Sequence, residues 1–585
     1  MSVANITIDG KVTAVPPGTT ILEAAKGLAI HIPTLCHLEL HRMDVRNQPA
    51  SCRVCVVEVD GRRNLAPACA TPVSEGMVVK THSLRVMDAR KAVLELILSD
   101  HPRECLICSR SGDCELQNLT ERFGLREVRF QGEMSTYPKD HSPAIVRDMD
   151  KCVMCRRCET MCNEVQACKV LSGVNRGFTS VVAPAFELNL DETVCTNCGQ
   201  CVAVCPVGAL TERDHTAEVM EALADPDKVV VVQTAPAIRA ALGESLGIEP
   251  GTLVTGKMVT ALRELGFDHV FDTNFTADLT IMEEGSELLD RLNRHLSGDQ
   301  SAKLPILTSC CPAWVKFYEH HFPDLLDLPS TAKSPQQMFG SLAKSYFAEK
   351  IGISREKMVV VSIMPCLAKK YEAARPEFAV GGSPDVDYVL STRELARLIK
   401  TANIDFASLP DGEFDQPLGE STGAAVIFGA TGGVLEAAVR TAYEVATGQE
   451  LPRLDYQELR GSEGVRTATV AIGDLELKLG VVHKLGNARG LMEKIRSGAE
   501  QFHAIEVMSC PGGCIGGGGQ PYHHGCEEIL QKRTAAIYRD DRNKPLRKSH
   551  ENPYVQELYR NFLGKPLSEK SHELLHTHYV ERQSL

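Results

Sequence analysis

Hydrophobic and polar positions follow two different periods in the first hundred residues. Residues 6–15, ITIDGKVTAV, form two alternating runs joined by Asp9-Gly10, and this pattern predicts a β-hairpin. A helix is expected from about Thr20 to Leu28, and a second hairpin in CVVEVDGRRNLAPAC turns at Asp60-Gly61. Residues 84–100, LRVMDARKAVLELILSD, carry apolar side chains at helical spacing, which predicts a longer helix.

From about residue 216 the pattern changes to buried strands that alternate with helices. The strand-like runs are KVVVVQ, KLPILT, MVVVSI and FHAIEVM, and STRELARLIKTA is typical of the helices between them. Such alternation predicts an α/β domain with a largely parallel sheet. Within residues 531–585, the stretch 547–579 has helical periodicity again, and its irregularly spaced histidines are expected to be packing and surface residues.

Composition narrows the class of protein. A chain of 585 residues predicts several domains, and its net charge of −13, with no long basic run, argues against a nucleic-acid partner. We expect a cytoplasmic protein without a membrane span, because neither a secretory signal nor 18 consecutive apolar residues occur. The 22 cysteines favour metal binding over disulfides in such a chain.

Two groups of metal-ligand type lie near the N-terminus. The first group surrounds the second hairpin and consists of Cys36, Cys52, Cys55 and Cys69. It suits tetrahedral zinc, but a hairpin, a helix and four loop cysteines also resemble β-grasp ferredoxins that hold a 2Fe–2S cluster. The second group has the spacing H-x3-C-x2-C-x5-C and consists of His101, Cys105, Cys108 and Cys114. Zinc is again an alternative, and the spacing resembles a 4Fe–4S module of complex I and of large iron-only hydrogenases.

Two further cysteine runs repeat the pattern C-x2-C-x2-C-x3-C. They are residues 152–162, CVMCRRCETMC, and residues 195–206, CTNCGQCVAVCP. In this repeat the fourth cysteine of each run ligates the cluster of the other run. The predicted ligands of cluster one are Cys152, Cys155, Cys158 and Cys205, and those of cluster two are Cys195, Cys198, Cys201 and Cys162. The pattern predicts a two-cluster 4Fe–4S ferredoxin domain.

Three strands of the α/β region end in cysteines. These are Cys310 and Cys311 after PILTS, Cys366 after VVVSIMP, and Cys510 and Cys514 after AIEVMS. Ligands in α/β sheets bind beyond the carboxyl ends of strands, so four of these thiols could share one buried site. Buried core thiols are the alternative. Because successive side chains at a strand end point in opposite directions, Cys310 and Cys311 are not expected to ligate the same metal.

The glycines of residues 516–519 bear on the same site. They would let the backbone approach something bulky, and they lack the lysine and hydroxyl of a P-loop. Cys168 and Cys526 fit no ligand pattern and are expected to be structural.

The three segments TSCCPAW, MPCLAKK and EVMSCPGGCIGGGGQP resemble the signatures of iron-only (FeFe) hydrogenases. With the N-terminal cluster motifs in the same order, the resemblance extends to the catalytic subunits of NADP-reducing, multi-subunit hydrogenases of sulfate-reducing bacteria. It implies an H-cluster, which is a 4Fe–4S cubane joined to a diiron unit with carbonyl, cyanide and dithiolate ligands. The implied cubane ligands are Cys311, Cys366, Cys510 and the bridging Cys514. The implied pocket residues are Lys369, as a donor to a cyanide, and Pro236, Ala237, Gln336, Met364 and Met508.

The resemblance also implies a role for Cys310. The diiron unit splits dihydrogen, and the proton then needs a chain of ionisable groups within hydrogen-bond reach of one another. The implied relay runs from Cys310 through a water to Glu284, Ser330 and Glu287, and reaches solvent near Arg291. From the residues alone, these carboxylates would be a solvated helix face.

The expected domain order follows the motifs. It is a β-grasp 2Fe–2S domain (1–80), a small helical 4Fe–4S module (81–121), a two-cluster ferredoxin domain (140–215), an α/β H-cluster domain (216–530) and a helical C-terminal segment that wraps it (531–585). Expected cofactors are one 2Fe–2S cluster, three accessory 4Fe–4S clusters and the H-cluster.

Partners are expected to supply what the motifs lack. No G-x-G-x-x-G follows a strand, so neither a nucleotide nor a flavin site is expected. Flavin- and NADP-binding subunits would then be partners in a hetero-oligomer, with ferredoxin as a further acceptor, and maturation proteins would build the H-cluster. The competing hypotheses are an electron-wiring subunit, a hydrogen sensor and a cluster-assembly factor.

Overall fold

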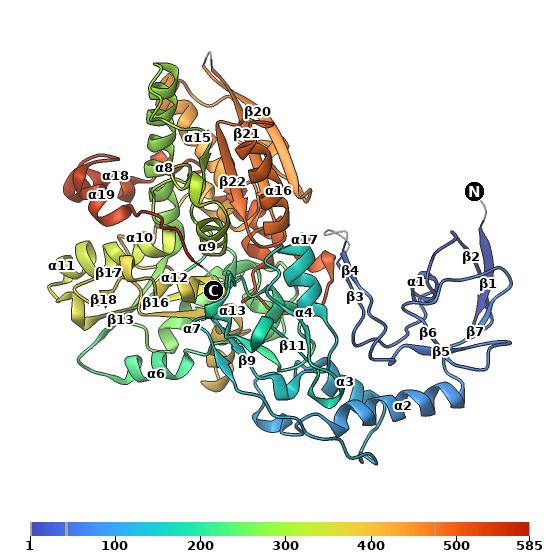
Figure 1. The fold of residues 1–585 in the computed structure, drawn as a ribbon. Coiled ribbons are helices and arrows are strands. Elements are labelled where there is room, and N and C mark those ends of the chain that lie inside the picture. Colours follow the sequence, from blue (N-terminus) through green and yellow to red (C-terminus); the bar gives the residue numbers. More distant parts are fainter. Residues whose placement is uncertain (1–2, 41–44, 474, 584–585) are drawn as a thin grey trace. The chain divides into compact units, whose positions relative to one another are not determined.

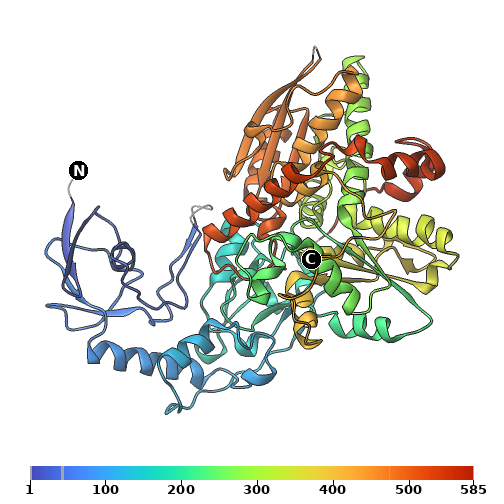
Figure 2. The same ribbon diagram turned by 180° about the vertical axis from the view of Figure 1, so that it is seen from behind.

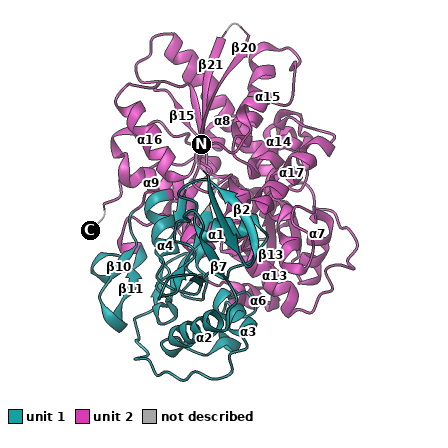
Figure 3. Ribbon diagram, turned by 90° about the vertical axis from the view of Figure 1, so that its right-hand side faces the viewer, with its two compact units in different colours: residues 1–164, 169–190, 204–211 teal, residues 165–168, 191–203, 212–585 magenta. Residues whose placement is uncertain are grey.

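The computed structural model describes residues 3–40, 45–473 and 475–583. The chain divides into two compact units, coloured separately in Figure 3. Unit 1 comprises residues 1–164, 169–190 and 204–211, and unit 2 comprises residues 165–168, 191–203 and 212–585. Within the described ranges, no helix combines the length and the apolar character needed to cross a membrane.

Unit 1 begins with a β-grasp-like arrangement of five strands and one helix (Figure 1). The strand order is β2-β1-β7-β5-β6. The predicted hairpin is present, since Ile8 of β1 pairs with Lys11 of β2 across the Asp9-Gly10 turn. Thr20 and Glu23 form a capping box that begins α1, and this satisfies backbone N–H groups that would otherwise be unpaired.

The strands and helices of unit 1 are the following. They are β1 (Ala4–Ile8), β2 (Lys11–Val15), α1 (Ile21–Gly27), β3 (Leu38–Leu40), β4 (Val45–Asn47), β5 (Val56–Val59), β6 (Ala66–Pro67), β7 (Val78–Lys80), α2 (Leu84–Ser99), α3 (Glu115–Arg122), β8 (Asp140–His141), β9 (Ile145–Arg147), α4 (Arg157–Thr160), β10 (Ser172–Val174) and β11 (Val181–Ala183). Helix α2 is the long blue helix after the β-grasp sheet (Figure 1 and Figure 2). It matches the helix predicted for residues 84–100.

Unit 2 contains two four-stranded sheets. One has the order β14-β13-β16-β19 and is parallel throughout. The other has the order β15-β22-β21-β20, in which only the edge strand β20 is antiparallel. The sequence predicted a largely parallel sheet, and the structure divides these strands between two sheets, because pairing is decided by contacts between distant segments.

The strands and longer helices of unit 2 are the following. They are α6 (Thr216–Ala224), β13 (Val229–Thr234), α7 (Thr255–Glu264), β14 (His269–Asp272), α8 (Thr273–Leu296), β15 (Ile306–Leu307), α9 (Pro312–His321), α10 (Pro335–Leu342), α11 (Ala348–Ile351), β16 (Met358–Met364), α12 (Ala368–Ala373), β17 (Ala379–Val380), β18 (Ser383–Pro384), β19 (Tyr388–Ser391), α13 (Thr392–Thr401), α14 (Gly423–Val426), α15 (Gly433–Thr447), β20 (Val465–Ile472), β21 (Leu475–His483), α16 (Leu485–Arg496), β22 (Ala504–Met508), α17 (Glu527–Asn543), α18 (Pro553–Leu558) and α19 (Glu569–Leu575). Helix α5 (Gln200–Val204) and strand β12 (Leu210–Glu212) each contain residues of both units.

Helix α8 connects the hydrophobic cores of the two sheets. Phe275 and Leu279, near its start, belong to the core of the first sheet. Leu288 and Leu292, near its end, belong to the core of the second sheet. The helix therefore presents the residues between these pairs, including three glutamates, at the junction of two cores.

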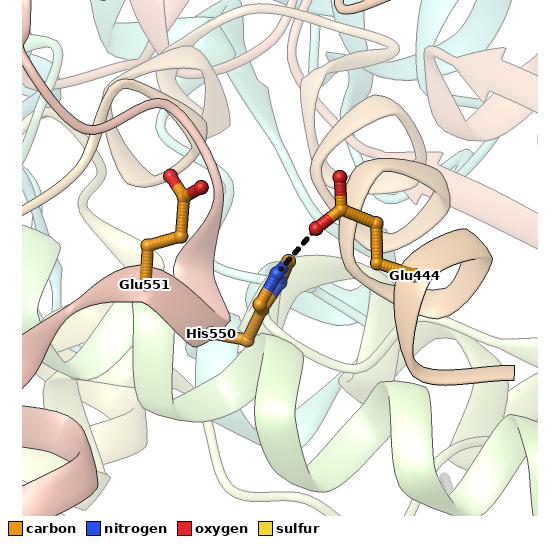
Figure 4. A group of neighbouring side chains, drawn as sticks. All are labelled: Glu444, His550 and Glu551. Atoms are coloured by element: carbon orange, nitrogen blue, oxygen red, sulfur yellow. Dashed lines mark hydrogen bonds and ion pairs between the residues drawn. The ribbon is translucent and has the colours of Figure 1, made fainter. Parts of the chain in front are cut away.

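The C-terminal segment, residues 531–585, is fixed to the rest of unit 2 by packing and by polar contacts. Leu558, Leu563 and Leu575 enter the core of the first sheet. His550 contacts Glu444 of α15 through Nε2 at 2.9 Å, and Glu551 lies nearby (Figure 4). Because the Lys548 ammonium bonds both Glu444 and Glu551, this cluster is satisfied as an ion-pair network.

Candidate functional site

The N-terminal group of four cysteines comes together in unit 1. The Cys69 thiol interacts electrostatically with Cys55, Cys36 and Cys52, and three of the four side chains are buried.

The second group is more open, because Cys105 is exposed while Cys114 and His101 are buried. His101 Nδ1 is buried without a hydrogen-bond partner among the described residues, and burial lowers the pKa of this imidazole to about 4. A neutral, unsatisfied imidazole suits a metal ligand.

The two C-x2-C-x2-C-x3-C runs share one backbone conformation. Met154 and Arg156 have positive φ in the first run, and Asn197 and Gly199 have positive φ at the equivalent positions of the second. Turns of this kind direct successive N–H groups into a common concavity, which favours a negatively charged cluster. Cys152, Cys155, Cys158 and Cys205 line a single cavity of unit 1. Cys195, Cys198, Cys201 and Cys162 are all half-buried.

Unit 2 holds a buried cavity at the carboxyl ends of three strands. Its lining includes Cys311 after β15, Cys366 after β16, and Cys510 and Cys514 after β22. The Cys366 and Cys510 thiols hydrogen-bond each other, which lowers the pKa of Cys366 and raises that of Cys510. Ser509 approaches the Cys311 sulfur with its hydroxyl at 3.2 Å and its N–H at 3.4 Å. The four thiols and these N–H and O–H donors form a donor set that fits a 4Fe–4S cubane.

The glycine run after Cys514 makes this convergence possible. A Cβ at Gly517 would lie 2.2 Å from the carbonyl oxygen of Pro365, and the Gly519 N–H donates to the same oxygen at 2.8 Å. The loop that carries Cys514 therefore lies directly against the loop that carries Cys366. The bulky neighbour expected from the sequence is thus protein backbone.

Lys369 is held at the cavity by a carboxylate that the sequence did not reveal. Its Nζ donates to Glu372 Oε2 at 2.9 Å and to the carbonyl of Cys310 at 3.1 Å. The same Oε2 accepts hydrogen bonds from Gln336 Nε2 and Ser334 Oγ. Burial alone would lower the pKa of Lys369, but Glu372 and the thiols of Cys310 and Cys366 raise it, so the ammonium remains charged. The i, i+3 spacing of Lys369 and Glu372 on α12 was the available signal.

Cys310 lines the same cavity as the four thiols, and its side chain is only partly buried. Pro236, Gln336, Met364, Lys369 and Met508 also line it. Ala237 is fully buried outside the lining, where its carbonyl accepts from Gln520 at 3.2 Å.

The glutamates of α8 are buried, contrary to the solvated face that the residues alone would suggest. Glu284 is 6% exposed and Glu287 is 8% exposed. Ser330 Oγ donates to Glu287 Oε2 at 2.7 Å, and Arg291 binds Glu287 Oε1 at 2.5 Å. Burial, reinforced by the charge of Glu287, raises the pKa of Glu284 to about 8. Glu284 Oε1 has no hydrogen-bond partner among the described residues.

Comparison with known proteins identifies the family. Residues 228–518 match the protein family described as "Iron only hydrogenase large subunit, C-terminal domain". Residues 527–582 match the family described as "Iron hydrogenase small subunit". The NADP-reducing hydrogenase subunit HndD of Solidesulfovibrio fructosivorans is 70% identical over 586 residues, which cover 100% of both chains. The chain belongs to the iron-only (FeFe) hydrogenase family.

Other matches agree with this FeFe-hydrogenase assignment. Iron hydrogenase 1 of Clostridium pasteurianum is 38% identical, with 96% of this chain and 97% of that protein covered. The solved structure of an apo FeFe-hydrogenase from Chlamydomonas reinhardtii is 44% identical, with a TM-score of 0.57, and the match covers 63% of this chain and 99% of that one. Both confirm the resemblance drawn from the three signature segments.

The N-terminal part of this FeFe-hydrogenase matches iron–sulfur domains. The matched descriptions are a 2Fe-2S iron-sulfur cluster binding domain (2–83), an NADH-ubiquinone oxidoreductase-G iron-sulfur binding region (90–129) and an NADH-quinone oxidoreductase subunit 3 ferredoxin-like domain (142–211). The chain is therefore the catalytic subunit of a hydrogenase, with iron–sulfur electron-transfer domains ahead of its catalytic domain.

Proposed function

We propose that this chain catalyses the reversible oxidation of dihydrogen at an H-cluster in the unit 2 cavity and passes electrons to partners that reduce NADP. One observation carries the proposal: four cysteines from three strand ends, a fifth cysteine and a charged lysine line one buried cavity. Cys311, Cys366, Cys510 and Cys514 would hold the cubane, with Cys514 bridging to the diiron unit. When bound, the H-cluster supplies heterolytic cleavage of dihydrogen.

The residues around the cavity would orient and insulate this group. The Lys369 ammonium, fixed by Glu372, would donate to an anionic ligand, and such a charge-assisted bond is strong where water is excluded. Pro236, Gln336, Met364 and Met508 would exclude water as lining residues. Gln336 is additionally oriented by its bond to Glu372 at 3.0 Å. Ala237 would act through backbone packing behind the lining.

A proton would leave the cavity through Cys310, a water, Glu284, Ser330 and Glu287, with Arg291 at the exit. The unsatisfied Glu284 Oε1 is the acceptor that such a water would contact. A pKa of about 8 suits Glu284 to both gain and release a proton near neutral pH. Ser330 interacts with both glutamates and can donate to either.

The second cysteine run, residues 195–201, would connect the catalytic cubane to the accessory clusters. Its last two residues begin helix α5. Gln200 Nε2 donates to the carbonyl of Gly516 at 3.0 Å, and a Cβ on Gly518 would lie 2.7 Å from the carbonyl oxygen of Cys198. Both contacts join this loop to the one that carries Cys514. We further propose the domain division and the cluster inventory expected from the sequence: one 2Fe–2S cluster, and one 4Fe–4S cluster at His101, Cys105, Cys108 and Cys114, followed by the two ferredoxin-type clusters.

The NADP acceptor is proposed from the relative with the name NADP-reducing hydrogenase subunit HndD. Flavin- and NADP-binding partner subunits would complete the transfer, and ferredoxin is a second proposed acceptor. Maturation proteins would build the diiron unit. A cytoplasmic location follows from an NADP acceptor.

The test compares two cysteine variants. Cys310→Ala should keep the infrared carbonyl and cyanide bands of the H-cluster but lose at least 100-fold in hydrogen turnover, because a methyl group cannot pass a proton. Cys310→Asp should be less harmful. Cys514→Ala should lose the diiron infrared bands while signals from the N-terminal clusters persist. Near-parental turnover in Cys310→Ala would contradict the relay, and turnover in Cys514→Ala would contradict the H-cluster assignment. A non-catalytic wiring, sensory or assembly role predicts no turnover in the parent.

A further inference from the structure

The C-terminal strap, residues 575–579, pairs with the loop that carries Ser330. Ala332 and His576 form an antiparallel bridge. The Lys333 N–H donates to the carbonyl of Leu575, and the Thr577 N–H donates to that of Thr331, both at 2.7 Å. The Tyr579 hydroxyl donates to the carbonyl of Ser330. The strap therefore holds the backbone of residues 330–333, here called the relay loop, through hydrogen bonds at Ser330, Thr331 and Lys333.

His576 joins the relay loop to helix α8. Its Nδ1 lies 2.8 Å from Thr331 Oγ1, and its Nε2 lies 3.1 Å from Glu283 Oε2. The His576 side chain is 4% exposed and Glu283 is fully buried. A histidine with both ring nitrogens engaged has one orientation, so it sets the distance between the loop and the helix.

Glu283 is a fixed anchor for this histidine. It also accepts from the Tyr559 hydroxyl at 2.6 Å and from the Leu567 N–H at 2.8 Å. Burial alone would raise the pKa of Glu283, but these hydrogen bonds, with that of His576 the largest, hold the pKa below its ordinary value. The carboxylate is therefore ionised, and every donor that it binds in the described part of the chain lies in the C-terminal segment.

The relay loop in turn holds the residues of the proposed proton path. Ser330 Oγ donates to Glu287 Oε2 at 2.7 Å, and the Thr331 N–H donates to the same oxygen at 3.0 Å. Glu284 follows Glu283 directly on α8, so one turn of the helix carries both the anchor and a relay group. A shift of the strap would be passed to Ser330 and Glu287 through these bonds.

We propose that the C-terminal strap positions the proton relay, with His576 as the positioning residue that ties the relay loop to Glu283. This inference rests on the proposed relay of Glu284, Ser330 and Glu287. The strap carries no proton itself. It keeps the Ser330 hydroxyl within reach of both glutamates, and a displacement of about 1 Å at such a donor is enough to slow proton transfer markedly.

The test uses the holoenzyme with His576→Ala, the conservative His576→Gln, and the matched control His578→Ala, which removes an exposed histidine of the same strap. Amide hydrogen exchange is measured by mass spectrometry over residues 328–335. Hydrogen evolution with a viologen dye is measured across pH and in deuterated solvent. We expect His576→Ala to exchange at least tenfold faster in this peptide and to turn over about tenfold more slowly. Its solvent isotope effect should rise while its infrared bands stay parental.

His576→Gln should recover part of the turnover, because its amide can still donate to Glu283, and His578→Ala should match the parent. Faster exchange without any change in turnover or isotope effect would overturn the inference, since the strap would then be merely structural. Unchanged exchange would overturn it as well. If His576→Ala does not fold, Tyr559→Phe weakens the same anchor and must shift both readouts in the same direction.

Glu284→Gln separates this inference from the proposed function. Parental turnover in Glu284→Gln would contradict the proposed proton relay, whatever the results for the strap variants. A strong loss in Glu284→Gln with parental behaviour in all strap variants would leave the relay intact and overturn only the role of the strap.

Discussion

Glu284 is a carboxyl group whose protonation couples folding to pH. Its pKa is about 8 in the folded chain, chiefly because of burial, against an ordinary value near 4.5. Between these values the folded state keeps a proton that the unfolded state has released. Stability therefore falls as pH rises from about 4.5 to 8, at about 1.4 kcal/mol for each unit of pKa shift.

Glu284→Gln should remove this dependence, because the amide does not titrate. Between pH 5 and pH 8 the melting temperature of the parent should fall by a few degrees more than that of the variant, measured by scanning calorimetry. Asp290→Asn, which changes an exposed carboxylate of the same helix, is the control and should follow the parent. Parallel pH profiles for parent and Glu284→Gln would show that the carboxyl group is ionised in the folded chain.

At the scale of secondary-structure elements, the local parts of the fold could be predicted and the distant pairings could not. The Asp9-Gly10 hairpin and helix α13 follow from residues within a few positions of each other. The division of the strands into two sheets depends on contacts across hundreds of residues. The same holds for site residues. The cysteines carry a spacing pattern, but His576 is 293 residues from Glu283, and nothing in its neighbourhood indicates that partner.

The contact between the second cysteine run, residues 195–201, and the loop after Cys514 gives a second prediction. Gly518→Ala would add a Cβ 2.7 Å from backbone atoms of Cys198 and Gly199, so one loop must move. We expect dye reduction by hydrogen to slow by about tenfold, while exchange between dihydrogen and deuterated water, which needs no external electron acceptor, stays close to parental.

Gly490→Ala is the matched control, because a Cβ there meets nothing within 4 Å. It should leave both activities unchanged. Equal loss of both activities in Gly518→Ala would indicate damage to the catalytic cavity itself. If both activities were retained, this contact would not be part of the electron-transfer route.

At the scale of the whole molecule, the chain combines a catalytic domain with iron–sulfur domains and is expected to need partners for NADP. The isolated chain should reduce viologen dyes with hydrogen but should not reduce NADP until flavin-containing partners are added. Deletion of residues 1–80 should spare dye reduction and uncouple NADP, if the 2Fe–2S domain receives the partner. NADP reduction at full rate by the purified chain alone would reveal a nucleotide site on this chain.

The shared backbone of the two cysteine runs has a consequence for repair after oxidative damage. Met154 and Arg156 adopt left-handed conformations that cost non-glycine residues on the order of 1 kcal/mol each, whereas Asn197 and Gly199 tolerate them. Once its iron is lost, the backbone of the first run can release this strain by leaving the left-handed conformation. The second run carries no comparable strain and can keep its conformation. Reloading with iron and sulfide should therefore be unequal in time, with the second run regaining its electron paramagnetic resonance signal before the first.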